Sequence, residues 1–359
     1  MTWTCDCVFR TVLAGQWPPA TWRARVRRFF AWRRSWACPH GSAGAAGGRE
    51  EVGGYAGGSS GGRRWRHGSS TQTALQLRAS AGVGAGGGAS AARKKNSAAV
   101  LFGAAGRMRY GLCCRQQLRN LVLSFNHLTG VLPTSIGCLS SSLSVLILGS
   151  NKIGGNIPDE IGNLTMLSYR SLKGNRFNGT IPSALYRLPN LERLYLHTNN
   201  LHGRIPECFG QSKRLGLLSL SQNMLSGQIP QGLGALPHLR ELDLSHNQLS
   251  RKIPASLGKC KTLELVDMAH NKLTRNIPSK VVGLQNLEFY FNVSGNLLQG
   301  SILEMSKMVM VLAIDVSQNN FSGGIPSALE SCKGLMYLNL SGNAFEGPIP
   351  VSLVNLKNL

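Results

Sequence analysis

Residues 191–209 read LERLYLHTNNLHGRIPECF, and residues 215–233 repeat the pattern as LGLLSLSQNMLSGQIPQGL. Both stretches follow the frame LxxLxLxxNxhxGxIPxxh, in which h is an apolar residue. The asparagine of this frame recurs at steps of 23 to 25 residues, at Asn126, Asn151, Asn175, Asn199, Asn223, Asn247, Asn271, Asn296, Asn319 and Asn343. A fixed period of this length indicates a repeat solenoid, in which each unit shares its core with its neighbours.

Each part of the frame has a physical role. The apolar residues of LxL alternate with period two, which predicts a short strand with its leucines turned inward. One strand per unit stacks into a parallel sheet, with about 4.8 Å between strands. The asparagine side chain is expected to hydrogen-bond backbone groups of the turn that would otherwise be buried and unpaired. Glycine permits the tight backbone path, and the proline is expected to prevent a helix at its position.

These repeats resemble plant-type leucine-rich repeats over residues 112–359. Residues 132–167 (LPTSIGCLSSSLSVLILGSNKIGGNIPDEIGNLTML) and residues 290–350, which end in NLSGNAFEGPIP, are similar to ectodomains of plant leucine-rich repeat receptor-like serine/threonine kinases. The resemblance implies an α/β fold, a right-handed solenoid with its parallel sheet on a concave face. It also implies a cell-surface signalling receptor, acting in defence or development, that binds a protein or peptide ligand and a co-receptor.

Members of that family also carry a signal peptide, a cysteine-containing cap, a transmembrane helix and a kinase domain, and the sequence shows none of these patterns. The kinase signatures HRD, DFG and VAIK do not occur. The sequence also contains no run of about 18 apolar residues, which is the length needed to cross a bilayer. The chain stops at Leu359, where the next LxxLxL is due. We therefore expect a binding function without catalysis, in an ectodomain fragment that is truncated at its C-terminal end. Plasma-membrane or extracellular location is implied by the resemblance alone.

Residues 1–111 differ from the repeats in composition. They contain all six tryptophans, and residues 1–110 hold 17 of the 39 lysines and arginines but 3 of the 16 aspartates and glutamates. Residues 41–62 and 79–92 are Gly/Ala/Ser tracts with too little apolar surface to offset the entropy of ordering them. We expect residues 1–111 to be a basic, mostly disordered segment in front of a solenoid at residues 112–359.

Two other functions remain open on the sequence. A soluble leucine-rich repeat protein of the cell wall, acting as an inhibitor or a decoy, would use the same solenoid. The basic N-terminal arm could instead associate with nucleic acid, because the clusters RARVRRFFAWRR and GGRRWRH interleave arginine with aromatic residues. No fold is expected to hold these clusters in place, so no specific nucleic acid is predicted as a partner.

No cofactor or metal is expected. The GxGxxG pattern at residues 82–87 has no strand before it and no helix after it, so the geometry that cradles a phosphate is missing. The nine cysteines show no metal-binding spacing. Cys260 and Cys332 lie 72 residues apart and both occupy an apolar slot of the frame. At three strand spacings, roughly 14 Å, they are too distant for a disulfide and are expected to fill the core.

The candidate binding site is the outward-facing side of the predicted strands, which is the usual partner surface of such solenoids. One cluster departs most from the framework residues and is predicted to contact a partner: Arg193, Tyr195, His197, Ser219, Asp243 and Asp267. An exposed tyrosine between an arginine and a histidine has the amphipathic character of an interface anchor. The competing interpretation is plain framework, because Asp and Ser are frequent in the LDLS form of the repeat.

Two further features of the repeats are their glycosylation sequons and their departures from the frame. Five Asn-x-Ser/Thr sequons could carry glycans if the chain is exported, at Asn163, Asn178, Asn292, Asn320 and Asn339. Arg170 occupies a strand position that the frame reserves for leucine, and Leu303 stands where proline belongs. Both departures are expected to weaken their repeat units.

Overall fold

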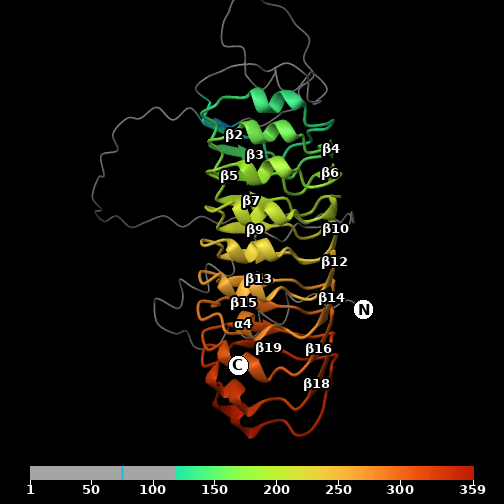
Figure 1. Ribbon diagram of the computed structural model, residues 1–359, viewed down its shortest axis with the longest axis vertical. Coiled ribbons are helices and arrows are strands. Elements are labelled where there is room, and N and C mark those ends of the chain that lie inside the picture. The colour runs from blue at the N-terminus through green and yellow to red at the C-terminus, as the bar shows by residue number, and fades with distance from the viewer. Residues whose placement is uncertain (1–73, 77–117) are drawn as a thin grey trace, which may run out of the picture. The chain divides into compact units, whose positions relative to one another are not determined.

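The computed structural model describes residues 74–76 and 118–359. Its main sheet consists of eleven parallel strands in sequence order: β1 (Ala74–Gln76), β2 (Asn120–Val122), β3 (Val145–Ile147), β5 (Tyr169–Ser171), β7 (Arg193–Tyr195), β9 (Leu217–Ser219), β11 (Glu241–Asp243), β13 (Leu265–Asp267), β15 (Tyr290–Asn292), β17 (Ala313–Asp315) and β19 (Tyr337–Asn339). The repeats therefore form the predicted stack (Figure 1). Apart from β1, residues 1–111 lie outside the described residues. The predictions made for them, which are the disorder, the GxGxxG pattern and the basic clusters, therefore lie outside the described residues too.

A second series of strands, which the sequence did not predict, runs along the other side of the repeats (Figure 1). We call this series the lateral sheet. Its two parts comprise β4 (Gly154–Asn156) paired with β6 (Arg176–Asn178), and the parallel strands β8 (His202–Arg204), β10 (Met224–Gly227), β12 (Gln248–Arg251), β14 (Lys272–Arg275), β16 (Leu297–Gly300), β18 (Asn320–Gly323) and β20 (Ala344–Phe345). Its strands fall on the segment after each ladder asparagine, where glycine and polar residues obscure the strand pattern.

Short 3₁₀ helices connect the two sheets within each repeat: η1 (Thr134–Cys138), η2 (Asp159–Asn163), η3 (Ser183–Arg187), η4 (Glu207–Gln211), η5 (Gln231–Ala235), η6 (Ala255–Lys259), η7 (Leu303–Lys307), η8 (Ser327–Ser331) and η9 (Val351–Asn355). One repeat has a single α-helical turn instead, α4 (Ser279–Val282). At its own position the proline is in extended backbone, as expected, but in nearly every repeat a short helix that was not predicted begins at the next residue. The fixed φ of proline and its missing N–H suit the position where a helix begins.

The repeat around Leu303 shows what the missing proline changes. The residues directly before the next two helices are prolines: Pro326 has φ −75° and ψ 130°, and Pro350 has φ −62° and ψ 128°. Ile302, which precedes η7, instead has φ −94° and ψ 12°. The Ser301 hydroxyl accepts a hydrogen bond from the Leu303 N–H at 3.1 Å, a donor that proline would not have.

The core lies between the two sheets and consists of the apolar frame residues, which are buried along the whole stack. Cys260 and Cys332 are fully buried within it, so their expected role as core-filling residues is confirmed. Arg170 is the exception among these residues. It is fully buried, and its register partners on the neighbouring strands are Leu146 and Leu194. A charged side chain thus occupies a leucine position of the core, as its place in the frame predicted.

The ladder asparagines make the predicted backbone hydrogen bonds. Asn247 Nδ2 donates to the carbonyl oxygens of Leu220, Leu244 and Ser245 at 3.0–3.1 Å. Its Oδ1 accepts from the N–H of Leu225 at 3.0 Å. The same four contacts recur at Asn175, Asn199, Asn223, Asn271, Asn296, Asn319 and Asn343. Each asparagine therefore joins its own strand exit to the preceding repeat.

Two positions of every repeat adopt the left-handed backbone region. One is the residue before the ladder asparagine, where His246 has φ 51° and Gln318 has φ 53°. The other is the glycine of the frame, and in two repeats an arginine replaces it: Arg251 has φ 68° and Arg275 has φ 71°. A residue with a Cβ is strained in this region by about 1–2 kcal/mol. The strain recurs in two successive repeats.

Arg251→Gly is expected to raise the free energy of unfolding by about 0.5–1 kcal/mol, because relief of left-handed strain exceeds the extra entropy that glycine gives the unfolded chain. Urea denaturation followed by circular dichroism measures this change. Gly323→Ala is the matched control, since Gly323 has φ 81° and no atom lies within 4 Å of an added Cβ. That control should lose stability by a similar amount. A loss of stability in Arg251→Gly would show that the arginine makes a compensating contact.

Candidate functional site

The six predicted site residues all lie on the outward side of the main sheet or one strand exit beyond it. Their burial differs from the expectation of a solvent-facing column. Arg193 is exposed, Tyr195 and Asp267 are half-buried, and the other three are buried: His197, Ser219 and Asp243. The expectation that Tyr195 is exposed is therefore corrected to half-buried. Neighbouring strands are only about 4.8 Å apart, so larger side chains on these strands cover short ones such as Ser219 and Asp243 and limit their contact with solvent.

The structure groups three aromatic rings on β5, β7 and the end of β7. The ring centroids of Tyr169 and Tyr195 are 5.6 Å apart at 44°, and those of Tyr195 and His197 are 6.3 Å apart in an edge-to-face arrangement. Burial raises the pKa of both tyrosines. Burial, and secondarily the charge of Lys173, lowers the pKa of His197 to about 3. The cluster is therefore an uncharged aromatic surface at neutral pH.

Opposite charges border this aromatic surface. Arg193 is exposed on β7, and Glu241 is half-buried on β11. Burial and the nearby Glu264 raise the pKa of Glu241, while the positive charges of Arg193 and Arg240 act in the lowering direction. Sequence reasoning missed Tyr169 and Glu241. They occupy the residue directly before the LxL core of their repeats, in the same register column as Arg193, so this column was the signal that could have found them.

The acidic members of the predicted cluster have a structural role. Asp243 Oδ1 accepts hydrogen bonds from the Ser245 N–H at 2.9 Å and from the Ser245 hydroxyl at 2.8 Å. The same contacts join Asp315 to Ser317. A side chain that accepts a hydrogen bond from the backbone N–H two residues later forms a local turn, and here this turn lies at the end of the strand. The framework interpretation of these aspartates therefore has direct support in the structure.

Two carboxylates nevertheless lie in register on adjacent strands, Asp243 on β11 and Asp267 on β13. Burial raises the pKa of Asp243 to about 6, against the hydrogen bonds from Ser245. Burial, and then the charge of Asp243, raises the pKa of Asp267 well above its usual value. Two desolvated carboxylates one strand apart favour protonation of at least one of them. In the next strand, β15, the register position is Asn292, which carries no charge.

Asp243→Asn is expected to stabilise the protein at pH 7 by about 1–2 kcal/mol. The raised pKa means that the folded chain binds more protons than the unfolded chain between pH 4 and about 6. The free energy of unfolding therefore falls as pH rises through that window, and the penalty persists above it. Asparagine preserves the local contacts, because Asn339 accepts the same two bonds from Ser341.

The measurement is the urea midpoint at pH 4, 5, 6 and 7 for the natural chain and the variant. The gain should be largest at pH 7 and should vanish at pH 4. The matched control is Asp159→Asn, since Asp159 is exposed on η2. An equal gain at every pH would assign the effect to something other than the carboxylate charge.

The sequons differ in their accessibility. Asn163, Asn178 and Asn320 are exposed, on η2, β6 and β18. Asn292 is 7% exposed, and its Oδ1 accepts a hydrogen bond from the Ser294 N–H. Asn339 is half-buried and is held by Ser341. Only the first three therefore offer a free side-chain amide to a glycan in the folded state.

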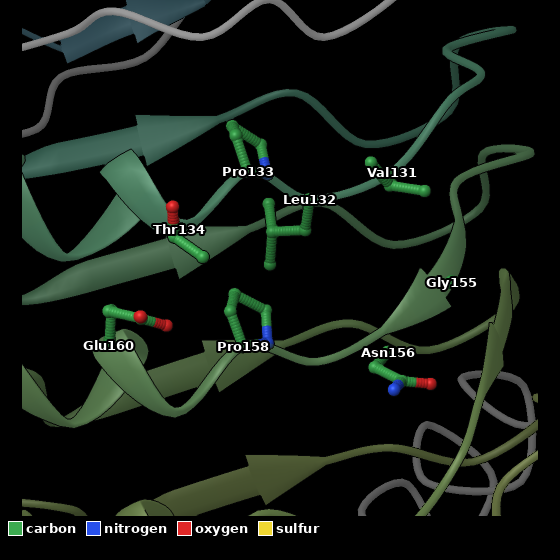
Figure 2. A pocket seen from close by; sticks show the side chains of 8 residues that line it. All are labelled: Val131, Leu132, Pro133, Thr134, Gly155, Asn156, Pro158 and Glu160. Carbon is green, nitrogen blue, oxygen red and sulfur yellow. The ribbon is translucent and has the colours of Figure 1, made fainter.

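A shallow hollow of about 470 Å³ lies on the lateral side of the first two repeats. Figure 2 shows that residues of two successive repeats line it: Val131, Leu132, Pro133, Thr134, Gly155, Asn156, Pro158 and Glu160. Its walls are mostly apolar, and Glu160 is its one titratable residue. A single carboxylate without a nearby base, nucleophile or cation has none of the pairing that acid–base or nucleophilic chemistry needs. The hollow is therefore a surface feature of the repeat.

Among residues 74–76 and 118–359, no group of three His, Cys, Asp or Glu side chains could hold a metal ion. Within the same residues, no helix has the length and apolar character needed to cross a membrane.

Comparison with known proteins agrees with this geometry. Leucine rich repeat family models match residues 189–249 and four further segments, residues 117–139, 142–164, 311–332 and 334–356. This chain is a leucine-rich repeat protein. A stretch of 57 residues of this leucine-rich repeat protein is 49% identical to the LRR receptor-like serine/threonine-protein kinase EFR of Arabidopsis thaliana, over 16% of this chain and 6% of that protein.

Solved structures extend the likeness of this leucine-rich repeat protein along the stack. The Arabidopsis receptor kinase HAESA, solved in complex with the peptide hormone IDA and the co-receptor SERK1, is 36% identical with a TM-score of 0.57. That match covers 68% of this chain and 45% of the HAESA chain in that structure. A plant ice-binding protein is 29% identical with a TM-score of 0.60, and the match covers 67% of this chain and 77% of that one. The repeats are thus of the plant receptor-kinase ectodomain type, and the chain spans less than half the length of its receptor relatives.

Proposed function

We propose that this leucine-rich repeat protein binds a peptide ligand on the outward side of its main sheet, between β5 and β11. The observation that carries the proposal is the aromatic pair Tyr169 and Tyr195, bordered by Arg193 on one strand and Glu241 two strands on. Half-buried tyrosines supply contact area at low entropic cost, and the two flanking charges orient a ligand. Sequence similarity to HAESA, whose solved complex contains a peptide hormone, supports the choice of ligand class.

The same similarity supports the setting of this function. We place the chain outside the cell, as part of a receptor that signals at the plasma membrane in defence or development, with a co-receptor as a second partner. Glycans would occupy Asn163, Asn178 and Asn320, whose side chains are exposed.

Tyr195→Ala is expected to weaken binding of selected peptides at least about tenfold, because buried aromatic anchors carry most of an interface's energy. Peptides would be selected from a random display library against the full chain, and affinities measured by calorimetry. Because Tyr195 also packs on Tyr169, Arg193→Ala is the second variant, since its exposed side chain can be removed without loss of core packing.

Thermal unfolding of each variant distinguishes lost binding from lost structure. Arg176→Ala, exposed on β6 of the lateral sheet, is the matched control and should bind like the natural chain. Peptides that bind all three variants equally would place the binding surface elsewhere. Failure to enrich any peptide would argue against a peptide ligand.

A further inference from the structure

The lateral sheet carries exposed positive charges in five of six successive repeats. Seven cationic side chains are exposed there, and we call them the basic stripe: Lys152, Arg176, Arg204, Arg251, Lys252, Lys272 and Arg275. The segments from ladder asparagine to frame proline contain no Asp or Glu between residues 126 and 301, and the first such carboxylate is Glu346 in the last repeat. These segments therefore supply no carboxylate of their own in those repeats, and acidic residues follow the frame proline instead, as at Asp159, Glu160 and Glu207.

The charges of the stripe are not neutralised locally. None of the seven side chains forms an ion pair with another residue of the described part of the chain, where the two salt bridges are Arg240–Glu264 and Lys307–Glu304. Exposed like charges close together repel one another and lower stability. A folded protein that keeps such a row without counter-charges has a surface suited to an anionic partner.

The stripe is continuous along the stack. One of its repeats, at β10, has no cation of its own, and Arg204 from the preceding repeat reaches over it. A Cβ added at Gly227 would lie 3.1 Å from Arg204 Cγ and 3.5 Å from Arg204 Cδ and Nε. At about 4.8 Å per repeat, the row from Lys152 to Arg275 spans roughly 24 Å. Its length therefore suits several units of a linear polymer that carries negative charges.

The side chains between the cations indicate which polymer. Most are amides and hydroxyls, at Asn156, Asn178, Thr180, Asn200, Gln228, Gln248, Ser250, Thr274 and Asn276, and the exceptions include His202 on β8 and Met224 on β10. The amides and hydroxyls donate to and accept from hydroxyls. The strands from β4 to β16 expose one ring, the imidazole of His202 on β8, so the bases of a single-stranded nucleic acid would find no row of rings to stack on. The combination suits units that carry both a carboxylate and several hydroxyls.

We propose that the basic stripe of the lateral sheet binds a linear acidic polysaccharide, a polyuronate, along the axis of the solenoid. Each arginine or lysine pairs with a carboxylate of the polymer, and the amides between them bond its hydroxyls. This surface is separate from the peptide surface at Tyr195, so both ligands bind at once. The proposal for the stripe rests on its own cations and the polar side chains between them, and it does not depend on the peptide proposal.

The test uses the full chain and an oligogalacturonate of about ten units, with calorimetry at low and at physiological salt. The stripe variant replaces four exposed cations with glutamine: Arg176→Gln, Arg204→Gln, Lys252→Gln and Lys272→Gln. The control variant makes the same change in net charge at four exposed lysines on the helical side of the repeats: Lys259→Gln, Lys261→Gln, Lys280→Gln and Lys333→Gln. Residues 1–110 and their charge are present in both.

The stripe variant should bind the oligomer at least about tenfold more weakly, as expected for the loss of four exposed ion pairs. The control variant should stay within about twofold of the natural chain. A fully methyl-esterified oligomer, which has lost its carboxylates, should not bind. Peptide binding at Tyr195 should be unchanged in the stripe variant, which keeps this test distinct from that of the peptide surface.

Two results would overturn the proposal. Equal loss in both variants would show that net charge, and not the stripe, holds the polymer. Single-stranded DNA or anionic lipid vesicles that bind more tightly than the oligogalacturonate, and lose that binding in the stripe variant alone, would assign the surface to another class of partner. Circular dichroism melting of each variant establishes that the fold is retained.

Discussion

Arg170→Leu is expected to stabilise the solenoid by about 3 kcal/mol, since replacing a buried charge with a well-packed apolar side chain removes a large desolvation penalty. Arg170 is fully buried, with leucine register partners on both neighbouring strands. Its Nη2 donates to the Ile161 carbonyl oxygen at 3.3 Å. Its Nε and Nη1 atoms have no hydrogen-bond partner within the described residues. Burial lowers the pKa of this guanidinium to about 9.

The comparison is made by urea denaturation of the two chains at pH 7. A pH series adds a second readout, because a lowered pKa means that the folded natural chain binds fewer protons than the unfolded one above about pH 9. The natural chain should therefore gain stability above that pH, and the gap to Arg170→Leu should narrow. Arg176→Leu, at an exposed position of β6, is the control and should change stability little. A less stable Arg170→Leu would mean that the arginine is satisfied by contacts other than Ile161.

Asn247→Ala is expected to destabilise the solenoid by about 3–4 kcal/mol, because it leaves buried backbone groups without partners. The variant loses three donated hydrogen bonds and one accepted from Leu225, which together join two repeats. Asn247 lies near the middle of the stack. Stability in such arrays depends on the contacts between neighbouring repeats, so the loss should divide the array in two.

Hydrogen exchange measured by mass spectrometry tests this division as well as the size of the loss. Exchange should quicken around β9 to β12 before it does in distant repeats, and the urea transition should broaden. Asn200→Ala is the matched control, because Asn200 is exposed beside the ladder position at Asn199 and should shift stability by less than about 0.5 kcal/mol. A variant of Asn247 as stable as this control would show that water replaces the ladder side chain.

The candidate site could be predicted only in part. The alternation around LxL placed Arg193 and Tyr195, which flank Leu194, on the outward side of a strand, and the structure agrees. The burial of His197 and the contact between Tyr195 and Tyr169 could not be predicted, because both depend on side chains that are 24 or more residues away in sequence and one strand away in space. The hydrogen bond that Asp243 accepts from Ser245 could have been predicted, since the two residues are only two apart in the sequence.

The lateral sheet could not be predicted from the sequence, for a different reason. Its strands contain glycines, serines and arginines, so no residue pattern distinguishes them from a loop. They become strands because each repeat is set beside the last by the leucine core and the asparagine ladder. The left-handed backbone at Arg251 has the same origin, since an isolated arginine would avoid it.

By itself, the sequence determined the period, the inward leucines, the asparagine ladder and the core place of Arg170. These follow from side-chain chemistry within one repeat, and a 24-residue period displays it many times over. Only the tertiary structure decided the second sheet, which outward side chains are buried, and which charges line up across repeats. Those properties depend on stacking, because residues far apart in the chain become neighbours only when successive repeats close over a shared core.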